Sequence, residues 1–162
     1  MGDWLMYWKE HWIDCDHYDP LSGGWHTEQQ FFYDQVMPGD SLWIVINGGT
    51  ERPEDWLLFE RIVAAGKKMK NKPRPYFIIG DPKKSERFDL EGQDNFEPVL
   101  HKLQFRTGTK IRTQGPMIGR SLQRIRPLCD KDTVLLEGYS KRLAHRTKKH
   151  TRRKDKRFAV LG

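Results

Sequence analysis

Two tryptophans, Trp12 and Trp25, lie in or beside polar, glycine-rich stretches of the sequence. Burial in a hydrophobic core explains an aromatic side chain less well there than inside an apolar run. An accessible indole face stacks on a splayed-out nucleobase or encloses a methyl group. Because each stack contributes about 1–3 kcal/mol, two such faces offset the few kcal/mol that extruding a nucleotide costs. In the alternative interpretation, both indoles only fix their loops to the core.

Asp81 is a further candidate for contact with a base, since it follows the apolar run Tyr76–Ile79 after one glycine, Gly80. A carboxylate at the end of a strand accepts hydrogen bonds from a base amino group. Asp81 also precedes Pro82, however, and Asp is common in turns. A turn is therefore the favoured interpretation of Asp81.

Other kinds of chemistry leave weaker patterns. Residues 14–17, Asp-Cys-Asp-His, are dense in metal ligands, but no second pair follows at the spacing of a zinc site. Gly23-Gly24 and Gly48-Gly49 match neither a phosphate-binding loop nor a dinucleotide fingerprint, and the sequence contains no Gly-x-Ser-x-Gly motif. We therefore expect no bound metal and no cofactor, and we regard a non-enzymatic role as more plausible than catalysis.

The positive charge is concentrated at the C-terminal end. The chain has a formal net charge of +7, and residues 141–157 alone hold ten Lys and Arg against one acid, which gives +9. The other residues therefore sum to −2. Residues 141–157 contain one large apolar residue, Leu143, and therefore no stripe to pack, so we expect a solvated arm that neutralises phosphates. The candidate phosphate-binding residues are Lys148, Lys149, Arg152, Arg153 and Lys154.

Short apolar runs separated by turn signals predict a mixed α+β domain over residues 1–140, followed by a basic tail over 141–162. Residues 14–27 and 83–95 are expected to be loops. The predicted strands are Asp3–Trp8, Ser41–Ile46, Tyr76–Ile79 and, less clearly, Leu103–Phe105. Trp56–Ala65 fits a helix or a strand, and Ile62 and Val63, followed by Gly66, favour a strand. Short helices are expected over 28–36, 119–125 and 130–142. In Asp3–Trp8, alternation places Trp4 and Trp8 on one face and Leu5 and Tyr7 on the other, so both faces are apolar.

The order of these features resembles the PUA-like superfamily, and most closely its EVE domains, with YTH and ASCH domains as cousins. The resemblance covers about residues 3–140. Its matching segments are Asp3–Trp8, Gly24-Trp25, Pro38–Asp40 before Leu42-Trp43, Arg61–Val63 and Ile125–Leu128. It implies a PUA-like mixed β-barrel of five to six strands with flanking short helices. Such domains bind a nucleobase, often a modified one, flipped into a pocket with aromatic walls.

The resemblance also implies roles for individual residues. Trp25 would form a wall of the pocket, while His26 and Thr27 would contact the edge of the base. Trp12 would lie near the mouth, and either Trp12 or Trp43 would supply the second aromatic face. These domains are often fused to nucleases, so a nuclease is an expected partner besides DNA or RNA.

The sequence departs from the EVE pattern at two places. Tyr7 stands near the position where these domains usually carry a Lys, and residues 26–28, His-Thr-Glu, replace Val-Arg-Asn. We therefore expect a different readout of the base edge.

Two alternative functions stay open. Some ASCH-like relatives are amidohydrolases that act on a modified nucleoside with Lys, Glu and Thr, and Lys9, Glu28 and Thr27 are residues of these types. Alternatively, all the aromatics are core residues and the tail binds ribosomal RNA or an acidic partner.

The sequence also indicates the compartment. No run approaches 18 apolar residues, so no transmembrane helix and no membrane partner is expected. The N-terminal stretch carries Asp3, Lys9 and Glu10 and does not have the pattern of a signal peptide. Two cysteines form no disulfide framework. A cytoplasmic location is the expectation.

Overall fold

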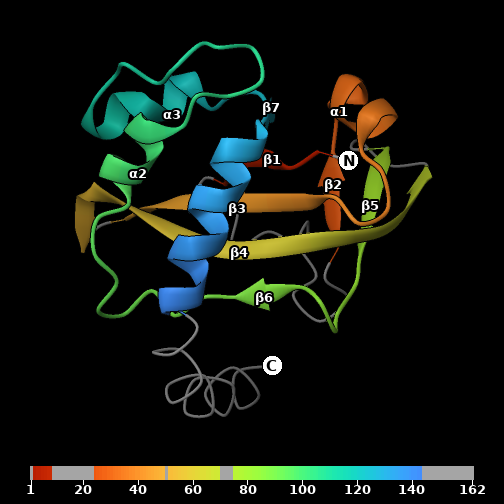
Figure 1. Ribbon diagram of the computed structural model, residues 1–162, viewed down its shortest axis with the longest axis horizontal. Coiled ribbons are helices and arrows are strands. Elements are labelled where there is room, and N and C mark those ends of the chain that lie inside the picture. Colours follow the sequence, from red (N-terminus) through yellow and green to blue (C-terminus); the bar gives the residue numbers. More distant parts are fainter. Residues whose placement is uncertain (1, 9–23, 50, 70–74, 144–162) are drawn as a thin grey trace.

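The computed structural model describes residues 2–8, 24–49, 51–69 and 75–143, and every structural statement below concerns these residues (Figure 1). The strands are β1 (Trp4–Tyr7), β2 (Trp25–Thr27), β3 (Ser41–Gly48), β4 (Arg52–Met69), β5 (Tyr76–Gly80), β6 (Glu86–Arg87) and β7 (Arg126–Pro127). The helices are α1 (Gln30–Gln35), α2 (Glu97–Lys102), the 3-10 turn η2 (Gly115–Met117), α3 (Ile118–Ser121) and a longer helix over residues 130–143. The fold is therefore α+β, as predicted.

The seven strands form one sheet with the order β2-β5-β4-β3-β1-β7, and β6 pairs with β4 beside this path. β1 runs parallel to β3, and the other pairings are antiparallel. Among the described strands, β2 and β7 are the two ends of this order and do not pair with each other. The sheet is therefore open.

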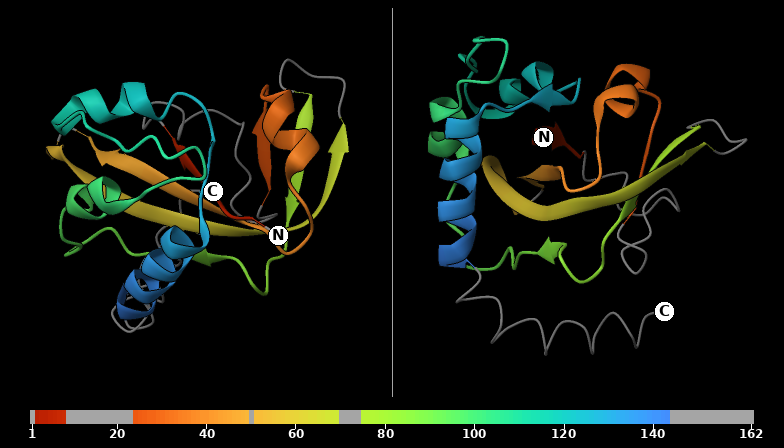
Figure 2. Two further views of the ribbon diagram at one scale, coloured as in Figure 1. Left: turned by 45° about the horizontal axis from the view of Figure 1, so that its top comes forward. Right: turned by 45° about the vertical axis from the view of Figure 1, so that its right-hand side comes forward.

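The long strand β4 connects the two halves of the sheet. Its first part pairs with β3 up to Val63, and its last part, Ala64–Met69, pairs with β5. Register shifts interrupt both ladders, between Ile44 and Val45 on β3 and between Ala64 and Gly66 on β4. Bulges of this kind bend a strand and increase its twist. Figure 2 shows the resulting curve, with α2, α3 and the helix over 130–143 at one side and α1 beside β2 and β5 at the other.

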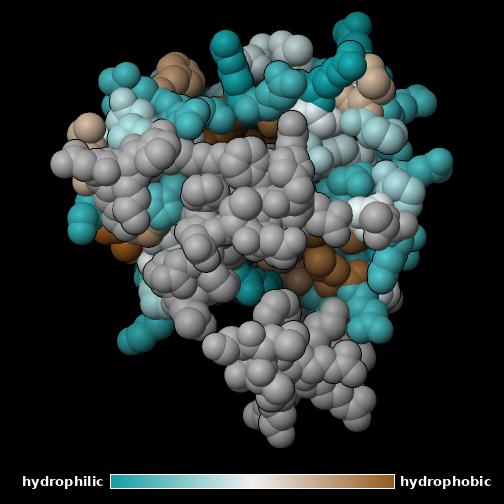
Figure 3. Space-filling model, turned by 180° about the vertical axis from the view of Figure 1, so that it is seen from behind, coloured by the Kyte–Doolittle hydropathy of each residue, from teal (hydrophilic) through white to brown (hydrophobic). Residues whose placement is uncertain are grey.

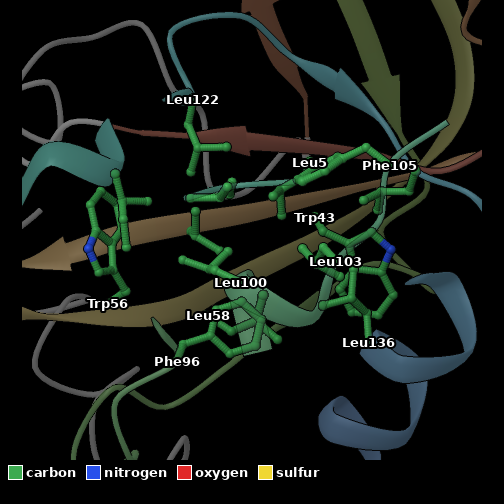
Figure 4. Close-up of a cluster of buried hydrophobic side chains, with 14 of the residues drawn as sticks. Leu5, Trp43, Trp56, Leu58, Phe96, Leu100, Leu103, Phe105, Leu122 and Leu136 are labelled. Carbon is green, nitrogen blue, oxygen red and sulfur yellow. The ribbon is translucent and has the colours of Figure 1, made fainter. Parts of the chain in front are cut away.

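Both faces of the sheet are buried, which confirms the alternation predicted for the first strand. Leu5 joins a core cluster with Trp43 and Trp56, which is covered by α2, α3 and the helix over 130–143 (Figure 4). Trp4 and Met6 join a second cluster on the opposite face. The members of the second cluster from the other elements include Trp25, Phe32, Ile44, Ile62, Ile78 and Ile125.

The structure corrects five predictions. The loop predicted over 83–95 contains β6, because Glu86–Arg87 pair with β4. Leu143, expected in a solvated arm, ends the helix over 130–143 and is buried in the core cluster of Leu5. Residues 103–105 form no strand, because they follow α2 and Phe105 takes a left-handed conformation with φ 57°. The helix predicted over 119–125 is confined to α3, Ile118–Ser121. The predicted loop over 14–27 ends in a strand, β2, because Trp25–Thr27 pair with β5.

Exposed apolar side chains are scattered over the described surface. Large apolar side chains are exposed singly on different elements, for example Phe31, Met69 and Val134. On the face opposite to that of Figure 1, small apolar patches alternate with hydrophilic side chains (Figure 3). Within the described residues, no helix combines the length and the apolar character needed to cross a membrane.

Candidate functional site

A cavity of about 300 Å³ lies between β1, β2 and the α3–β7 segment. Its first wall is the end of β1 with Met6, Tyr7 and Trp8. The second wall is residues 25–29, which comprise β2 and the turn into α1, and the third is Gly119 with residues 122, 123 and 125. In both views of Figure 2, β1 lies between these two other walls. The cavity thus occupies the seam between the two ends of the sheet.

Two indoles form an apolar corner of the cavity. Trp8 and Trp25 have exposed fractions of 6% and 7%, and their ring planes meet at 87° with centroids 5.9 Å apart. Phe59 supports Trp8 from behind, with ring centroids 5.2 Å apart. Edge-to-face contacts of this kind are favourable pairings of aromatic rings. Because the two indoles are perpendicular, a flat ring that stacks on one of them meets the other edge-on.

Polar side chains surround this corner. Thr27 is buried, Glu28 and Gln123 are exposed, and all three line the cavity. The Thr27 hydroxyl accepts a hydrogen bond of 3.0 Å from the backbone N–H of Gln29, and its own proton can be donated elsewhere. The Gln123 side-chain amide makes no hydrogen bond within the described part of the chain. Apolar walls with a few convergent polar groups are typical of sites that bind small ring systems.

Gln29 closes one side of the cavity. Its side-chain oxygen accepts a hydrogen bond of 2.8 Å from the backbone N–H of Ile125, and its Nε2 donates to the Gln123 carbonyl at 3.4 Å. Gln29 directly precedes α1, and Ile125 directly precedes β7. This side chain therefore connects the two ends of the open sheet.

Three predicted site residues border the cavity, and they do so differently. Alternation along β2 places the side chains of Trp25 and Thr27 on one face and that of His26 on the other. The His26 ring lies 4.4 Å from the Phe77 ring at an interplanar angle of 35°. Trp25 and Thr27 are thus well placed to contact a ligand, whereas the His26 ring packs on β5.

Two other predicted site residues lie elsewhere. Trp43 has an exposed fraction of 0% and belongs to the core cluster of Leu5, where its Nε1 donates to Asp3 Oδ2 at 3.1 Å. Trp43 pairs with Leu5 of β1, so its side chain lies on the face of the sheet opposite to Trp4 and Met6. It therefore cannot supply the second aromatic wall. Asp81 organises the turn after β5, because its Oδ1 accepts from the Lys83 N–H at 2.9 Å.

The remaining predicted site residues fall outside the described residues. Trp12 and the tail residues Lys148, Lys149, Arg152, Arg153 and Lys154 belong to this group, as do Lys9 of the hydrolase alternative and residues 14–17. Of the hydrolase residues, Thr27 and Glu28 border the cavity. Within the described ranges, no group of three His, Cys, Asp or Glu side chains is arranged to hold a metal ion.

A buried carboxyl group lies on the cavity side of the sheet. Glu60 has an exposed fraction of 4%, and it pairs across the ladder with Ile44, which in turn pairs with the cavity residue Met6. Its Oε2 has no hydrogen-bond partner, and the nearest cation is the Arg87 guanidinium at 3.9 Å. Burial raises the pKa of Glu60 to about 7, although Arg87 opposes this shift.

No family model matches the chain, and no curated protein sequence matches it. The assignment of a function therefore depends on the cavity and the charges around it. Trp8, Gln29 and Gln123 were not among the predicted site residues. Of these three, only Trp8 had a pattern in the sequence that indicates its position, because the alternation of side chains along a strand places Trp8 on the same face as Met6.

Proposed function

We propose that this protein is a non-enzymatic reader of nucleic acids that holds one base, flipped out of its stack, in the cavity beside Trp25. The observation that supports this most is that Trp25 and Trp8 form an apolar corner beside the polar side chains of Thr27, Glu28 and Gln123. The cavity volume of about 300 Å³ is at the lower end of the range for ligand pockets, roughly 300–1,000 Å³. It suits a single heterocycle better than an extended cofactor.

The corner also suits a modified base. A base that stacks on one indole directs one of its edges toward the perpendicular indole, where a methyl group has apolar surroundings. The other edge then faces the polar rim. We expect the stack to contribute about 1–3 kcal/mol, as base–aromatic contacts do in other proteins.

The proposed fold is a barrel of the PUA-like kind, with the cavity at its seam. The bend of β4 and the connection through Gln29 support it, because both bring the β2 end of the sheet toward the β7 end. In this proposal, the tail over residues 141–162 contacts phosphates and contributes affinity, while the cavity contributes selectivity. The nuclease partner and the cytoplasmic location stay predictions.

Tryptophan fluorescence tests the proposal. Free nucleosides, unmodified and methylated on adenine or cytosine, are titrated into the wild-type protein and into Trp25→Phe. A matched control is Trp43→Phe, which alters a buried indole that does not line the cavity. We expect at least one nucleoside to quench wild type and Trp43→Phe, and to quench Trp25→Phe far less. If no nucleoside quenches the wild type, or if Trp25→Phe and Trp43→Phe respond alike, the proposal is wrong.

The hydrolase alternative is distinguished by product analysis. An amidohydrolase that used Thr27 as nucleophile would cleave an amide bond of a modified nucleoside with one water, which gives a carboxylic acid and an amine, and Thr27→Ala would abolish the appearance of both products. If the protein is a non-enzymatic reader, the nucleoside is recovered unchanged from both the wild type and Thr27→Ala. Turnover by the wild type that Thr27→Ala removes would favour the enzyme.

A further inference from the structure

One segment of the folded domain is strongly basic, although residues 1–140 as a whole are slightly acidic. Residues 98–129 contain no Asp and no Glu. Seven cations lie in this segment: Lys102, Arg106, Lys110, Arg112, Arg120, Arg124 and Arg126. The other residues of 1–140 carry 21 acids and 12 Lys or Arg. The domain is therefore polarised, with +7 on one continuous segment and −9 on the rest.

This basic segment forms the third wall of the cavity. Gly119 and residues 122, 123 and 125 line it. Arg120 directly follows Gly119, and Arg124 lies between Gln123 and Ile125, so both cations are within one residue of the lining. Figure 1 shows the chain from α2 through α3 to β7 running along the top of the sheet toward β1.

Hydrogen bonds hold the basic segment in place. The Thr113 and Ser121 hydroxyls lie 3.0 Å apart and connect the stretch before η2 to α3. Arg126 donates to the Thr109 carbonyl, and its guanidinium stacks on the Phe105 ring. Arg106 donates from its backbone N–H to the Pro127 carbonyl at 3.0 Å. These contacts fix the backbone that carries the remaining cations.

Apart from Arg106 and Arg126, which make the contacts just described, the cations of this segment are exposed and form no ion pair within the described residues. They are Lys102, Lys110, Arg112, Arg120 and Arg124. Ion pairs of Lys or Arg in the described structure involve Arg52, Arg61 and Arg87, none of which belongs to the segment. The five charges thus remain available to an anion from outside.

From this arrangement we infer that residues 102–126 form a phosphate-binding rim at the mouth of the cavity, and that the full ligand is a nucleic-acid strand, of which a free nucleoside makes only the base contacts. The identity of the inserted base depends on the proposed function, whereas the phosphate contacts do not. Two cations next to lining residues, with further cations on the same segment, match a polyanion whose ring is inserted and whose backbone passes over the rim. Arg120 and Arg124 are the residues nearest to the inserted nucleotide.

The test uses the full chain, so the tail is the same in every variant. Short fluorescein-labelled single strands of DNA and of RNA with one mixed sequence are titrated between about 50 and 200 mM salt. The variants are Arg120→Gln/Arg124→Gln and, as a control of equal charge change, Lys83→Gln/Lys84→Gln in the exposed turn after β5. We expect the first variant to lower the slope of log affinity against log salt by roughly 1.4, since a single-strand phosphate contact contributes about 0.7. The control should change the slope much less.

Separate outcomes identify which proposal fails. If both double variants lower the slope equally, the rim does not exist, whatever Trp25→Phe shows. Trp25→Phe could bind nucleosides like the wild type while Arg120→Gln/Arg124→Gln lowers the salt slope as expected. In that case the phosphate-binding rim is supported and the proposal of a base-binding cavity is wrong. If vesicles containing an anionic phospholipid compete with the strand at equal charge concentration, the surface recognises anions in general and the inference of a nucleic-acid ligand is overturned. Equal affinities for the DNA and the RNA strand support contacts to phosphate alone. A higher affinity for one of them identifies that nucleic acid as the ligand.

Discussion

The side-chain oxygen of Gln29 accepts a hydrogen bond of 2.8 Å from the backbone N–H of Ile125. The two residues are far apart in the chain, and they adjoin elements at opposite ends of the strand order, since Gln29 follows β2 and Ile125 precedes β7. Both also line the cavity. This side-chain hydrogen bond therefore joins the two ends of the sheet at the proposed binding site.

Replacement of Gln29 by alanine should loosen this seam. A neutral hydrogen bond contributes about 0.5–1.5 kcal/mol, and a buried N–H left without a partner costs about 1–3 kcal/mol. We expect Gln29→Ala to lower the free energy of unfolding by about 1–2 kcal/mol and to accelerate amide exchange at Ile125. Chemical denaturation and hydrogen exchange measure the two effects. Gln35→Ala is the control, because Gln35 is exposed on α1; equal exchange at Ile125 in both variants would contradict the role of Gln29.

Much of the fold follows from local patterns. The alternation of Trp4 and Trp8 with Leu5 predicts a strand buried on both faces, and β1 is such a strand. Ser41–Ile46 and Tyr76–Ile79 likewise lie in β3 and β5. In each case a short run of apolar residues bounded by turn signals is sufficient to predict the element. Both faces are buried along most of β1 and β3, whereas Ile79 of β5 is exposed.

The unpredicted parts depend on long-range pairing. β2 is a strand because Trp25–Thr27 pair with β5, and turn-forming residues next to it conceal this in the sequence. The stretch 83–95, expected to be a polar loop, includes the buried Gln93. Its side-chain amide accepts from the Leu58 N–H at 2.6 Å and donates to the Leu58 carbonyl at 3.0 Å, as a neighbouring strand would. No local pattern indicates that a glutamine takes this position.

The residues of the candidate site also differ in whether the sequence could predict them. Trp25 was predicted because an aromatic residue beside glycines is unusual, and Thr27 because the resemblance implies a polar contact there; both line the cavity. Trp43 was wrong as a cavity residue because its face depends on the β1–β3 register, which pairs it with Leu5. Gln123 carried no signal, since its position depends on the fold of the α3–β7 segment.

Gln123 should read the base edge if the proposed function is right. Its exposed side chain lines the cavity, and a glutamine amide forms paired hydrogen bonds with a base edge that discriminate by about 1–3 kcal/mol. We expect Gln123→Ala to reduce the preference between bases at least fivefold and to leave the free energy of unfolding unchanged within about 0.5 kcal/mol. Competition between strands that differ at one base measures the preference. Gln104→Ala, at another exposed glutamine, should keep the wild-type preference; an unchanged preference in Gln123→Ala would exclude this contact.

Asp132 should be essential for stability. It has an exposed fraction of 1%, and its carboxylate accepts hydrogen bonds from the backbone N–H groups of Gln104, Phe105 and Cys129 at 2.8, 2.8 and 3.2 Å. These bonds join the helix over 130–143 to the left-handed residue Phe105. Hydrogen bonds to a charged group contribute about 1.5–3 kcal/mol each, so we expect Asp132→Ala to lower the free energy of unfolding by 3 kcal/mol or more.

Thermal and urea denaturation measure the effect of Asp132→Ala against Asp130→Ala, an exposed acid at the start of the same helix. Surface substitutions without such contacts change stability by about 0.5 kcal/mol or less. Similar losses in the two variants would show that the carboxylate of Asp132 contributes only through the helix end. An intermediate loss in Asp132→Asn is expected, since the amide keeps one acceptor oxygen.

Glu60 should make the stability of the protein depend on pH. Burial raises its pKa to about 7 in the folded state, from the ordinary value of 4.5. The folded protein therefore holds a proton that the unfolded chain releases, and the stability this provides is complete below about pH 4.5 and is lost as the pH rises to about 7. At about 1.4 kcal/mol per pKa unit, the loss amounts to up to about 3 kcal/mol.

The difference in unfolding free energy between Glu60→Gln and the wild type isolates this contribution, because all other titrating groups are common to both. The amide does not titrate, so the variant should gain up to about 3 kcal/mol relative to the wild type between about pH 5 and pH 8. Glu86→Gln provides the control, since Glu86 is exposed on the neighbouring strand β6 and should show no such gain. A difference that is constant with pH would mean that Glu60 is ionised in the folded state, with Arg87 compensating for its burial.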